Sequence, residues 1–378
     1  MKNLRVLVFS ATFGAGHVRA AEALIESIRQ INPYAEVKHL DCWAILGKQI
    51  NIVLTDFYIG MIKRTPKLWG KLYYGTAEIS PDSILQRFLN NTGHRKYLKY
   101  INSFKPDFII CTYPTVAGVL AQLRLKKILE IPLVVVVTDY AVHNQWIHPG
   151  VDLYIVACSD IYDGFVARGI EPDRIKVTGI PVSPKFECNL NRLEITESLG
   201  LLPDRPTCLI MGGAYGVLSE LKELCKTLAD TSVPSQTIVV CGQDKNLYES
   251  LDDVIENARN PMLRFGFVRN VDELMSAADI VITKAGGLTV SEALTKRLSI
   301  IIYKPIPGQE QENASYLEKI GAGITADTRE ELEKVLLSLM EHPEYMETMR
   351  QAAAKALPGE AAEQAVRHMM QLVKEVSN

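Results

Sequence analysis

Short apolar runs rich in β-branched residues alternate with segments of helical period along almost the whole chain. This alternation is typical of parallel sheets whose strands are joined by crossover helices. The chain has 378 residues, which exceeds the roughly 250–300 residues that one hydrophobic core usually serves. The sequence therefore predicts an α/β protein with two Rossmann-like domains facing each other across a cleft.

The expected strands fall into two sets. The first set comprises 4–10, 36–40, 108–112, 133–138, 153–157 and 175–178, and the second comprises 207–211, 237–241, 262–265, 280–283, 299–303 and 323–326. Two prolines in Ile180–Pro184 indicate a linker between the sets. We expect domains at residues 1–182 and 183–358, followed by an amphipathic C-terminal helix at 359–378.

The strand at 280–283 runs into Lys284-Ala285-Gly286-Gly287 and then into a predicted helix that contains Glu292. Two glycines let a ligand approach the backbone, and the unpaired N–H groups of the new helix suit a phosphate or diphosphate. Glu292 lies about one turn into the helix, where its carboxylate can accept hydrogen bonds from sugar hydroxyls. The pattern indicates a site for a nucleotide-linked sugar.

Other turns are predicted at the same edge of the second sheet. The polar run 308–313 follows the next strand, Met211-Gly212-Gly213 opens the domain as a second anion-binding turn, and Gly266-Phe267-Val268 ends another strand. Glycine-rich turns are also common as purely structural features. The last segment is equally consistent with a strand end buried in the core.

The first predicted strand is followed by Gly14, Gly16 and His17. Glycines at this turn of such folds usually allow tight turning and close approach of a ligand. An imidazole with an unperturbed pKa near 6.5 can take a proton from a hydroxyl group. We therefore predict His17 as a general base, with the alternative that it only caps or orients the loop.

A polar and aromatic segment, 138–146, follows the most hydrophobic strand of the first half. Asp139 is predicted to assist a base, and His143 and Trp146 to contact an acceptor. The alternative is a hydrogen-bonded loop that closes the domain.

Aromatic and basic residues are interleaved in the segment 43–75, where Asp56 is the only acid. This pattern favours a surface that binds anionic lipid, although an ordinary helix pair with a buried aromatic face is the alternative. From 42 to 105 ten basic residues outnumber three acids, while the whole chain carries a net charge of −3. The residues predicted to contact the membrane are Trp43, Lys63, Arg64, Lys67, Trp69 and Lys71.

Several function classes are disfavoured by the sequence. No nucleic-acid-binding motif is visible and the chain is slightly acidic. The chain has no Asp-x-Asp pair and no His or Cys cluster at ligand spacing, so no metal cofactor is expected. Seven cysteines without a C-x-x-C pair indicate a reducing compartment, and no apolar run approaches the roughly 20 residues of a membrane span.

Five stretches occur together in one order: FGAGH, VVVVTDYAVHNQWIHPGVDLYIVA, VTGIPVSPKF, MGGAYGVL, and GFV…KAGGLTVSEA…YKPIPGQEQENA. Over nearly the whole chain they resemble the monogalactosyl- and glucosyl-diacylglycerol synthases of glycosyltransferase family 28, in particular the bacterial processive diacylglycerol β-glucosyltransferases. The resemblance implies a GT-B fold and an inverting transfer of glucose from UDP-glucose to diacylglycerol. We expect a cytoplasmic protein, peripheral on the inner face of the cell membrane.

The resemblance also implies roles for individual residues. The uracil would face Gly266, Phe267 and Val268, and the diphosphate would lie at Gly286, Gly287 and Thr289. Glu292 would bind the ribose hydroxyls, and Gln309 and Glu310 would contact the sugar. Gly16 and His17 would lie beside the reacting centre. Relatives that transfer N-acetylglucosamine to a lipid-linked cell-wall precursor carry Gln-Gln where this chain has Gln309-Glu310, which disfavours that activity. A UDP-galactose-dependent synthase, a UDP-sugar sensor without catalytic activity and a nucleotide-sugar 2-epimerase remain alternatives.

Overall fold

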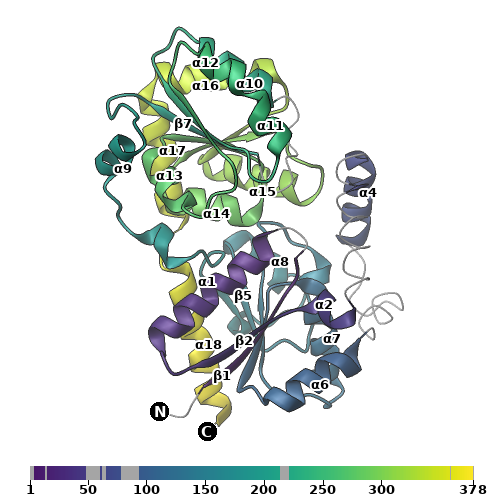
Figure 1. Cartoon of the computed structure of the whole chain (residues 1–378). Coiled ribbons are helices and arrows are strands. Elements are labelled where there is room, and N and C mark those ends of the chain that lie inside the picture. Colours follow the sequence, from purple (N-terminus) through teal and green to yellow (C-terminus); the bar gives the residue numbers. More distant parts are fainter. Residues whose placement is uncertain are drawn as a thin grey trace. The chain divides into compact units, whose positions relative to one another are not determined.

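The computed structural model describes residues 4–12, 15–47, 60–61, 65–77, 93–212, 221–357 and 359–377. The chain divides into two compact units. The first contains Met1–Pro184, Pro307–Gln309 and Glu360–Asn378, and the second contains Lys185–Ile306 and Glu310–Gly359. Each unit is a parallel sheet with helices on both faces (Figure 1).

The first unit is built on a six-stranded parallel sheet with the order β2-β1-β3-β4-β5-β6. Its strands are β1 Arg5–Ser10, β2 Glu36–Asp41, β3 Phe108–Cys111, β4 Leu133–Val136, β5 Leu153–Val156 and β6 Ile175–Val177. The strands β3, β4 and β5 are buried along their whole length, because a parallel sheet is covered by helices on both faces. The chain reverses its direction across the sheet between β1 and β3, and open α/β sheets bind ligands outside the carboxyl ends of the strands at such a point.

Helices on both sides of this sheet supply the rest of the core. They are α1 Ala15–Ile31, α2 Cys42–Leu46, α4 Pro66–Ala77, α6 His94–Phe104, α7 Pro114–Leu125, α8 Ser159–Val166 and α18 Ala361–Ser377, with 3-10 turns η1 Asn144–Trp146 and η2 Pro172–Arg174. In α1 the buried residues Ala21, Leu24 and Ile28 follow a helical period and form one apolar face.

The last helix of the chain belongs to the first unit. Its residues Ala365, Val366 and Met369 are fully buried in the same hydrophobic cluster as Leu24 and Ile28 of α1. Figure 1 shows α18 (yellow) lying beside α1 (purple). The hydrophobic core of the first unit therefore contains residues of both α1 and α18.

The second unit has a six-stranded parallel sheet of order β12-β11-β10-β7-β8-β9. Its strands are β7 Thr207–Met211, β8 Gln236–Val240, β9 Met262–Phe265, β10 Ile280–Thr283, β11 Ser299–Tyr303 and β12 Gly323–Ala326. Its helices are α9 Arg192–Ser198, α10 Leu221–Asp230, α11 Lys245–Ser250, α12 Asp252–Glu256, α13 Val271–Ala277, α14 Gly287–Thr295, α15 Gln309–Ile320, α16 Arg329–Glu341 and α17 Pro343–Ala356; η3 Pro184–Glu187 joins the units. The switch point of this sheet lies between β7 and β10.

The predicted fold class is confirmed. All twelve expected strands are present, with ends that differ by at most two residues from the expected ones. Long buried runs of β-branched residues explain this agreement, since they are found where a strand is covered on both faces.

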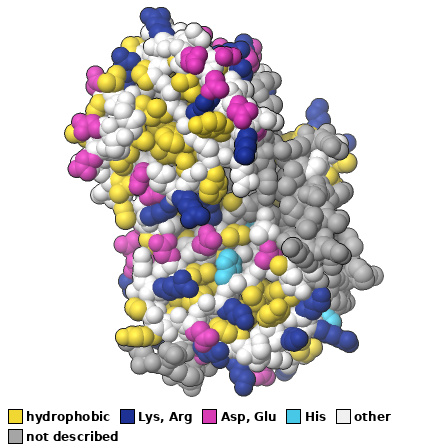
Figure 2. Space-filling model, viewed as in Figure 1, with side chains coloured by type: hydrophobic (Ala, Val, Ile, Leu, Met, Phe, Trp, Pro, Cys, Tyr) yellow, Lys and Arg dark blue, Asp and Glu magenta, His cyan; other side chains and the backbone are white. Residues whose placement is uncertain are grey.

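Charged side chains of both signs are interspersed on the face of the molecule drawn in Figure 2. Six of the ten basic residues between 42 and 105 lie in the described part of the chain, and all six are exposed: Lys67, Lys71, Arg95, Lys96, Lys99 and Lys105. The local excess of positive charge is therefore carried by solvent-facing side chains in the described residues.

Candidate active site

His17 lies in the first turn of α1, directly beyond the switch point of the first sheet. Its Nδ1 atom is 2.7 Å from the carbonyl oxygen of Thr112 and 2.9 Å from the hydroxyl of Thr138. Thr112 follows β3 and Thr138 lies two residues beyond β4. The fold thus brings residues from three segments together around one imidazole ring.

The contact with Thr112 determines which nitrogen of His17 carries the proton. A carbonyl oxygen only accepts hydrogen bonds, so Nδ1 donates and Nε2 keeps a lone pair. Burial lowers the pKa of His17 to about 4, and the bond to Thr112 opposes this shift in part. The expected unperturbed pKa is therefore wrong, because desolvation disfavours the imidazolium. At neutral pH the ring is uncharged and able to accept a proton.

Asp139 follows Thr138 and is buried, with 7% of its surface exposed. The indole N–H of Trp146 donates to its carboxylate at 3.3 Å. Burial raises the pKa of Asp139 to about 6, although the hydrogen bond from Trp146 opposes the shift. The Trp146 ring lies 6.3 Å from the His17 ring, measured between centroids. The predicted base, the predicted assisting acid and Trp146 are therefore neighbours in the first unit.

His143 is also buried, and both of its ring nitrogens have partners. Nδ1 accepts from the backbone N–H of Gln145 at 3.2 Å, so Nε2 donates to the carbonyl of Tyr73 at 3.2 Å. Burial lowers the pKa of His143. These contacts attach α4 to the loop after β4, which is a structural role; contact with an acceptor remains a prediction for His143 and Trp146.

The predicted membrane residues fall into three groups. Lys63 and Arg64 lie outside the described residues. Trp43 is partly buried, and its ring lies 6.2 Å from that of Tyr113, measured between centroids. Trp69 is partly buried too, whereas Lys67 and Lys71 are exposed on α4.

In the second unit, β10 runs through Gly286 into α14, as expected. Gly286 has a φ of −67°, which any residue can adopt. A Cβ atom added there would meet no atom within 4 Å. Neither conformation nor packing requires glycine at this position, so the open space next to the backbone is available for a ligand. Gly287 and Thr289 form the first turn of α14, where N–H groups are unpaired.

Glu292 lies on the second turn of α14 and is buried, with 3% of its surface exposed. Gly212 directly follows β7 on the other side of the switch point, and a Cβ there would contact only the Val240 carbonyl, at 3.8 Å. Its neighbour Gly213 lies outside the described residues. The two predicted anion-binding turns thus leave adjacent strands of one sheet.

Beyond β9, Phe267 is 60% exposed. The alternative that this segment is a strand end buried in the core is therefore wrong for Phe267. Gly266 and Val268, on either side of it, are partly buried. An exposed aromatic ring at the carboxyl end of a parallel strand offers a flat surface for a base to stack on.

Gln309 and Glu310 are the first two residues of α15. The Glu310 carboxylate accepts from the backbone N–H of Ile306 at 2.9 Å, so it caps the start of the helix. Burial raises the pKa of Glu310, and the charge of Lys284 and this hydrogen bond oppose the shift. Contact with a sugar remains a prediction for both residues.

The sequence reasoning missed Thr112 and Thr138, which hold the His17 ring. Their only signal in the sequence is their position at the ends of two neighbouring strands.

In the described ranges no group of three or more His, Cys, Asp or Glu side chains is arranged to hold a metal ion. No helix in these ranges is long and apolar enough to cross a bilayer.

Comparisons with known proteins define the class of this protein. Residues 17–182 match the family model for monogalactosyldiacylglycerol synthase, and residues 207–369 match the C-terminal domain of glycosyltransferase family 28. A processive diacylglycerol beta-glucosyltransferase of Bacillus pumilus is 32% identical over 350 residues, covering 92% of this chain and 90% of that protein. A second one, from Bacillus mycoides, is 35% identical over 325 residues, 86% of this chain and 82% of that protein.

Solved structures share the fold at low sequence identity. MurG of Acinetobacter baumannii superposes with a TM-score of 0.65 at 18% identity, covering 98% of this chain and 99% of that one. The fold and the family models define a glycosyltransferase of the GT-B type. Within that class, the chain belongs to the family of the processive diacylglycerol β-glucosyltransferases.

Proposed function

We propose that the protein transfers glucose from UDP-glucose to diacylglycerol at a membrane surface, with inversion at the anomeric carbon. The observation that carries the proposal is the His17 ring, whose Nδ1 donates to the Thr112 carbonyl and leaves Nε2 as a base. Relatives named as diacylglycerol beta-glucosyltransferases support glucose as the sugar and diacylglycerol as the acceptor.

In this mechanism the second unit binds the UDP moiety. The first turn of α14 offers unpaired N–H groups and the positive end of the helix dipole to the diphosphate. Glu292 accepts from the ribose hydroxyls, and Phe267 stacks on the uracil. These contacts hold the leaving group and stabilise the negative charge that develops on it.

The first unit supplies the proton acceptor. Nε2 of His17 takes the proton from the acceptor hydroxyl as its oxygen attacks the anomeric carbon from the face opposite UDP. One displacement of this kind converts an α-linked donor into a β-linked product. Asp139, next to Trp146, contributes negative charge to the surroundings of His17 once it is ionised.

The product assay tests the activity directly. The protein is incubated with diacylglycerol vesicles and labelled UDP-glucose or UDP-galactose in excess chelator, and the lipids are separated and analysed by NMR. We expect a β-glucosyl lipid without added metal, because the diphosphate is held by N–H groups and a helix dipole. An α-anomer, or complete dependence on Mg²⁺ or Mn²⁺, would contradict the mechanism. If more galactosyl lipid than glucosyl lipid is formed, the donor is UDP-galactose.

Exposed residues of α4 support docking on the membrane. Leu68 is 51% and Leu72 48% exposed, and the two are four residues apart on one face of the helix. Lys67 and Lys71 repeat with the same spacing and are exposed as well. Apolar side chains beside cations suit an interface with anionic lipid headgroups.

Replacing Lys67 and Lys71 with serine is expected to weaken binding to anionic vesicles. Each basic residue near such a surface contributes about 1 kcal/mol, so the pair corresponds to a loss of roughly 30-fold. Co-sedimentation with vesicles at low and high salt measures the loss of vesicle binding, and the affinity for UDP should not change. Replacing Lys334 and Lys355 of the second unit with serine is the matched control. Equal binding by both variants at low salt would exclude α4 as the docking surface.

A further inference from the structure

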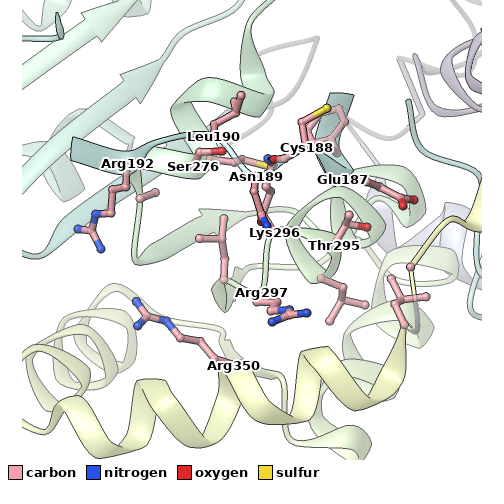
Figure 3. A pocket seen from close by; sticks show the side chains of 17 residues that line it. Glu187, Cys188, Asn189, Leu190, Arg192, Ser276, Thr295, Lys296, Arg297 and Arg350 are labelled. Atoms are coloured by element: carbon pink, nitrogen blue, oxygen red, sulfur yellow. Dashed lines mark hydrogen bonds between the residues drawn. The ribbon is translucent and has the colours of Figure 1, made fainter. Parts of the chain in front are cut away.

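A cavity of about 390 Å³ lies within the second unit, away from the ends of β7 and β10 that carry the candidate donor site. It is formed by the segment before α9, the end of α13, the turn after α14 and the helix α17. Four basic residues line it: Arg192, Lys296, Arg297 and Arg350. Figure 3 shows that Arg192 and Arg350 come from separate elements and that Lys296 and Arg297 are neighbours on another, with Glu187 as the acid among the labelled side chains.

Two of these cations share a single buried carboxylate. Arg192 donates to both oxygens of Asp279 at 2.6 Å, and Arg350 donates to one of them at 2.6 Å. The same carboxylate also accepts from the backbone N–H of Thr207 at 2.9 Å. One acid cannot neutralise two guanidinium groups, so this cluster keeps one excess positive charge.

Lys296 lies in the turn after α14, and its ammonium group donates to the carbonyl of Cys188 at 3.0 Å. Burial lowers the pKa of Lys296, although the charge of Asp272 opposes this shift. Asp272 is itself paired with Lys185 at 2.7 Å, so these two charges balance. With Arg192, Lys296, Arg297 and Arg350 set against Asp279 and Glu187, the remaining charged groups around the cavity carry a net charge of +2.

Arg297 occupies a backbone position that favours glycine. Its φ is 55°, in the left-handed region that L side chains rarely adopt. Its N–H donates to the Leu294 carbonyl and the N–H of Leu298 donates to that of Ala293, which closes α14 with a Schellman motif. Glycine is the usual residue at this position. An arginine in this conformation strains the backbone, and such strain is often found at functional positions.

The Arg297 side chain is exposed, and within the described part of the chain it has no hydrogen-bond or ion-pair partner. Its guanidinium group is therefore available to a ligand in the cavity. Nearby, Nε of Arg192 is buried and makes no hydrogen bond among the described residues. The Arg297 guanidinium is therefore the group at this cavity that a ligand can reach, whereas the Nε of Arg192 stays buried.

We propose that this cavity binds a phosphate group, either as inorganic phosphate or as a phosphomonoester. A phosphate dianion matches the net charge of +2, and its oxygens accept from the planar forks of arginine side chains. The cavity volume of about 390 Å³ also leaves room for a small organic group on the phosphate. The site is separate from the one proposed for UDP, since it lies at the C-terminal end of α14 and not at its N-terminus.

The test is a calorimetric titration of the full-length protein with inorganic phosphate and, separately, with glycerol 3-phosphate. Saturating UDP is present in both titrations, so that the proposed donor site is occupied. We expect binding of both anions in the unmodified protein. Tighter binding of glycerol 3-phosphate would identify a phosphomonoester as the ligand, and equal binding would identify the free anion.

The variant Arg297→Gly should lower the affinity for phosphate without lowering the stability of the fold. Loss of one charged hydrogen-bond donor should weaken phosphate binding by about tenfold or more, whereas the thermal midpoint should stay equal or rise because glycine adopts this conformation without strain. Arg259→Gln, an exposed arginine outside the cavity, is the matched control and should bind phosphate normally. Absence of binding in the unmodified protein, or unchanged affinity in Arg297→Gly, would overturn the proposal.

Discussion

Replacing His17 with alanine is expected to lower kcat by about 10²–10⁴-fold, because a positioned general base contributes that much. The affinity for UDP should remain unchanged, since His17 belongs to the first unit and the proposed UDP contacts belong to the second. Initial rates with diacylglycerol vesicles and calorimetry with UDP provide the two measurements. His342→Ala, an exposed histidine of the second unit, is the matched control.

The pH dependence of kcat/KM distinguishes the two candidate bases. A base must be deprotonated, so the rate falls as the pH falls through its pKa. The pKa of His17 is lowered to about 4 and that of Asp139 is raised to about 6. If His17 alone has to be unprotonated, activity should persist down to about pH 5. A decline centred near pH 6 that disappears in Asp139→Asn would assign the essential ionisation to Asp139.

An unaffected rate in His17→Ala, with the protein still folded by its thermal midpoint, would remove His17 from the mechanism. A milder variant tests how the ring is held. Thr138→Val removes the hydroxyl that lies 2.9 Å from Nδ1 but leaves the Thr112 carbonyl in place.

Replacing Glu292 with glutamine is expected to weaken UDP binding. A hydrogen bond to a charged group contributes about 1.5–3 kcal/mol, which corresponds to a loss of roughly 10- to 150-fold. Glutamine keeps the shape of the side chain, so no large cavity is created at this buried position. Calorimetry with UDP measures the change, and Glu256→Gln on the exposed surface of α12 is the control.

A comparison of two ligands isolates the ribose contact. If Glu292 accepts hydrogen bonds from the ribose hydroxyls, its replacement should weaken the binding of UDP. It should leave unchanged the binding of dideoxy-UDP, which lacks both hydroxyls. The four affinities form a thermodynamic cycle in which the coupling energy belongs to the contact alone. A coupling near zero would place Glu292 in the packing of α14 instead of the ribose site.

The strand-to-helix turns were predictable because they depend on local sequence. The run Ile280–Thr283 is apolar and β-branched, and Gly286 and Gly287 follow it directly. The beginning of α1 near His17 was expected on similar grounds, from a strand followed by glycines and an alanine-rich helix. Such patterns place residues at the carboxyl ends of strands without knowledge of tertiary contacts.

Properties that depend on long-range packing were not predictable. The shift in the pKa of His17 arises from burial among segments up to 121 residues away in sequence. Likewise, nothing in the local sequence of Trp43 indicated that its ring lies next to that of Tyr113, 70 residues away. The cavity around Arg297 gave no signal in the sequence, because its basic residues come from separate segments with unremarkable local patterns.

The packing of α18 on α1 determines the order in which the core of the first unit is completed during synthesis. The ribosome makes residues up to Pro184 first, but Ala365, Val366 and Met369 fill the cluster that contains Leu24 and Ile28. At about 5–20 residues per second, roughly 10–40 s separate Pro184 from Met369. During this interval all of the second unit is synthesised, as one largely continuous segment. The part of the chain that is translated first is therefore the last to have its complete set of core residues.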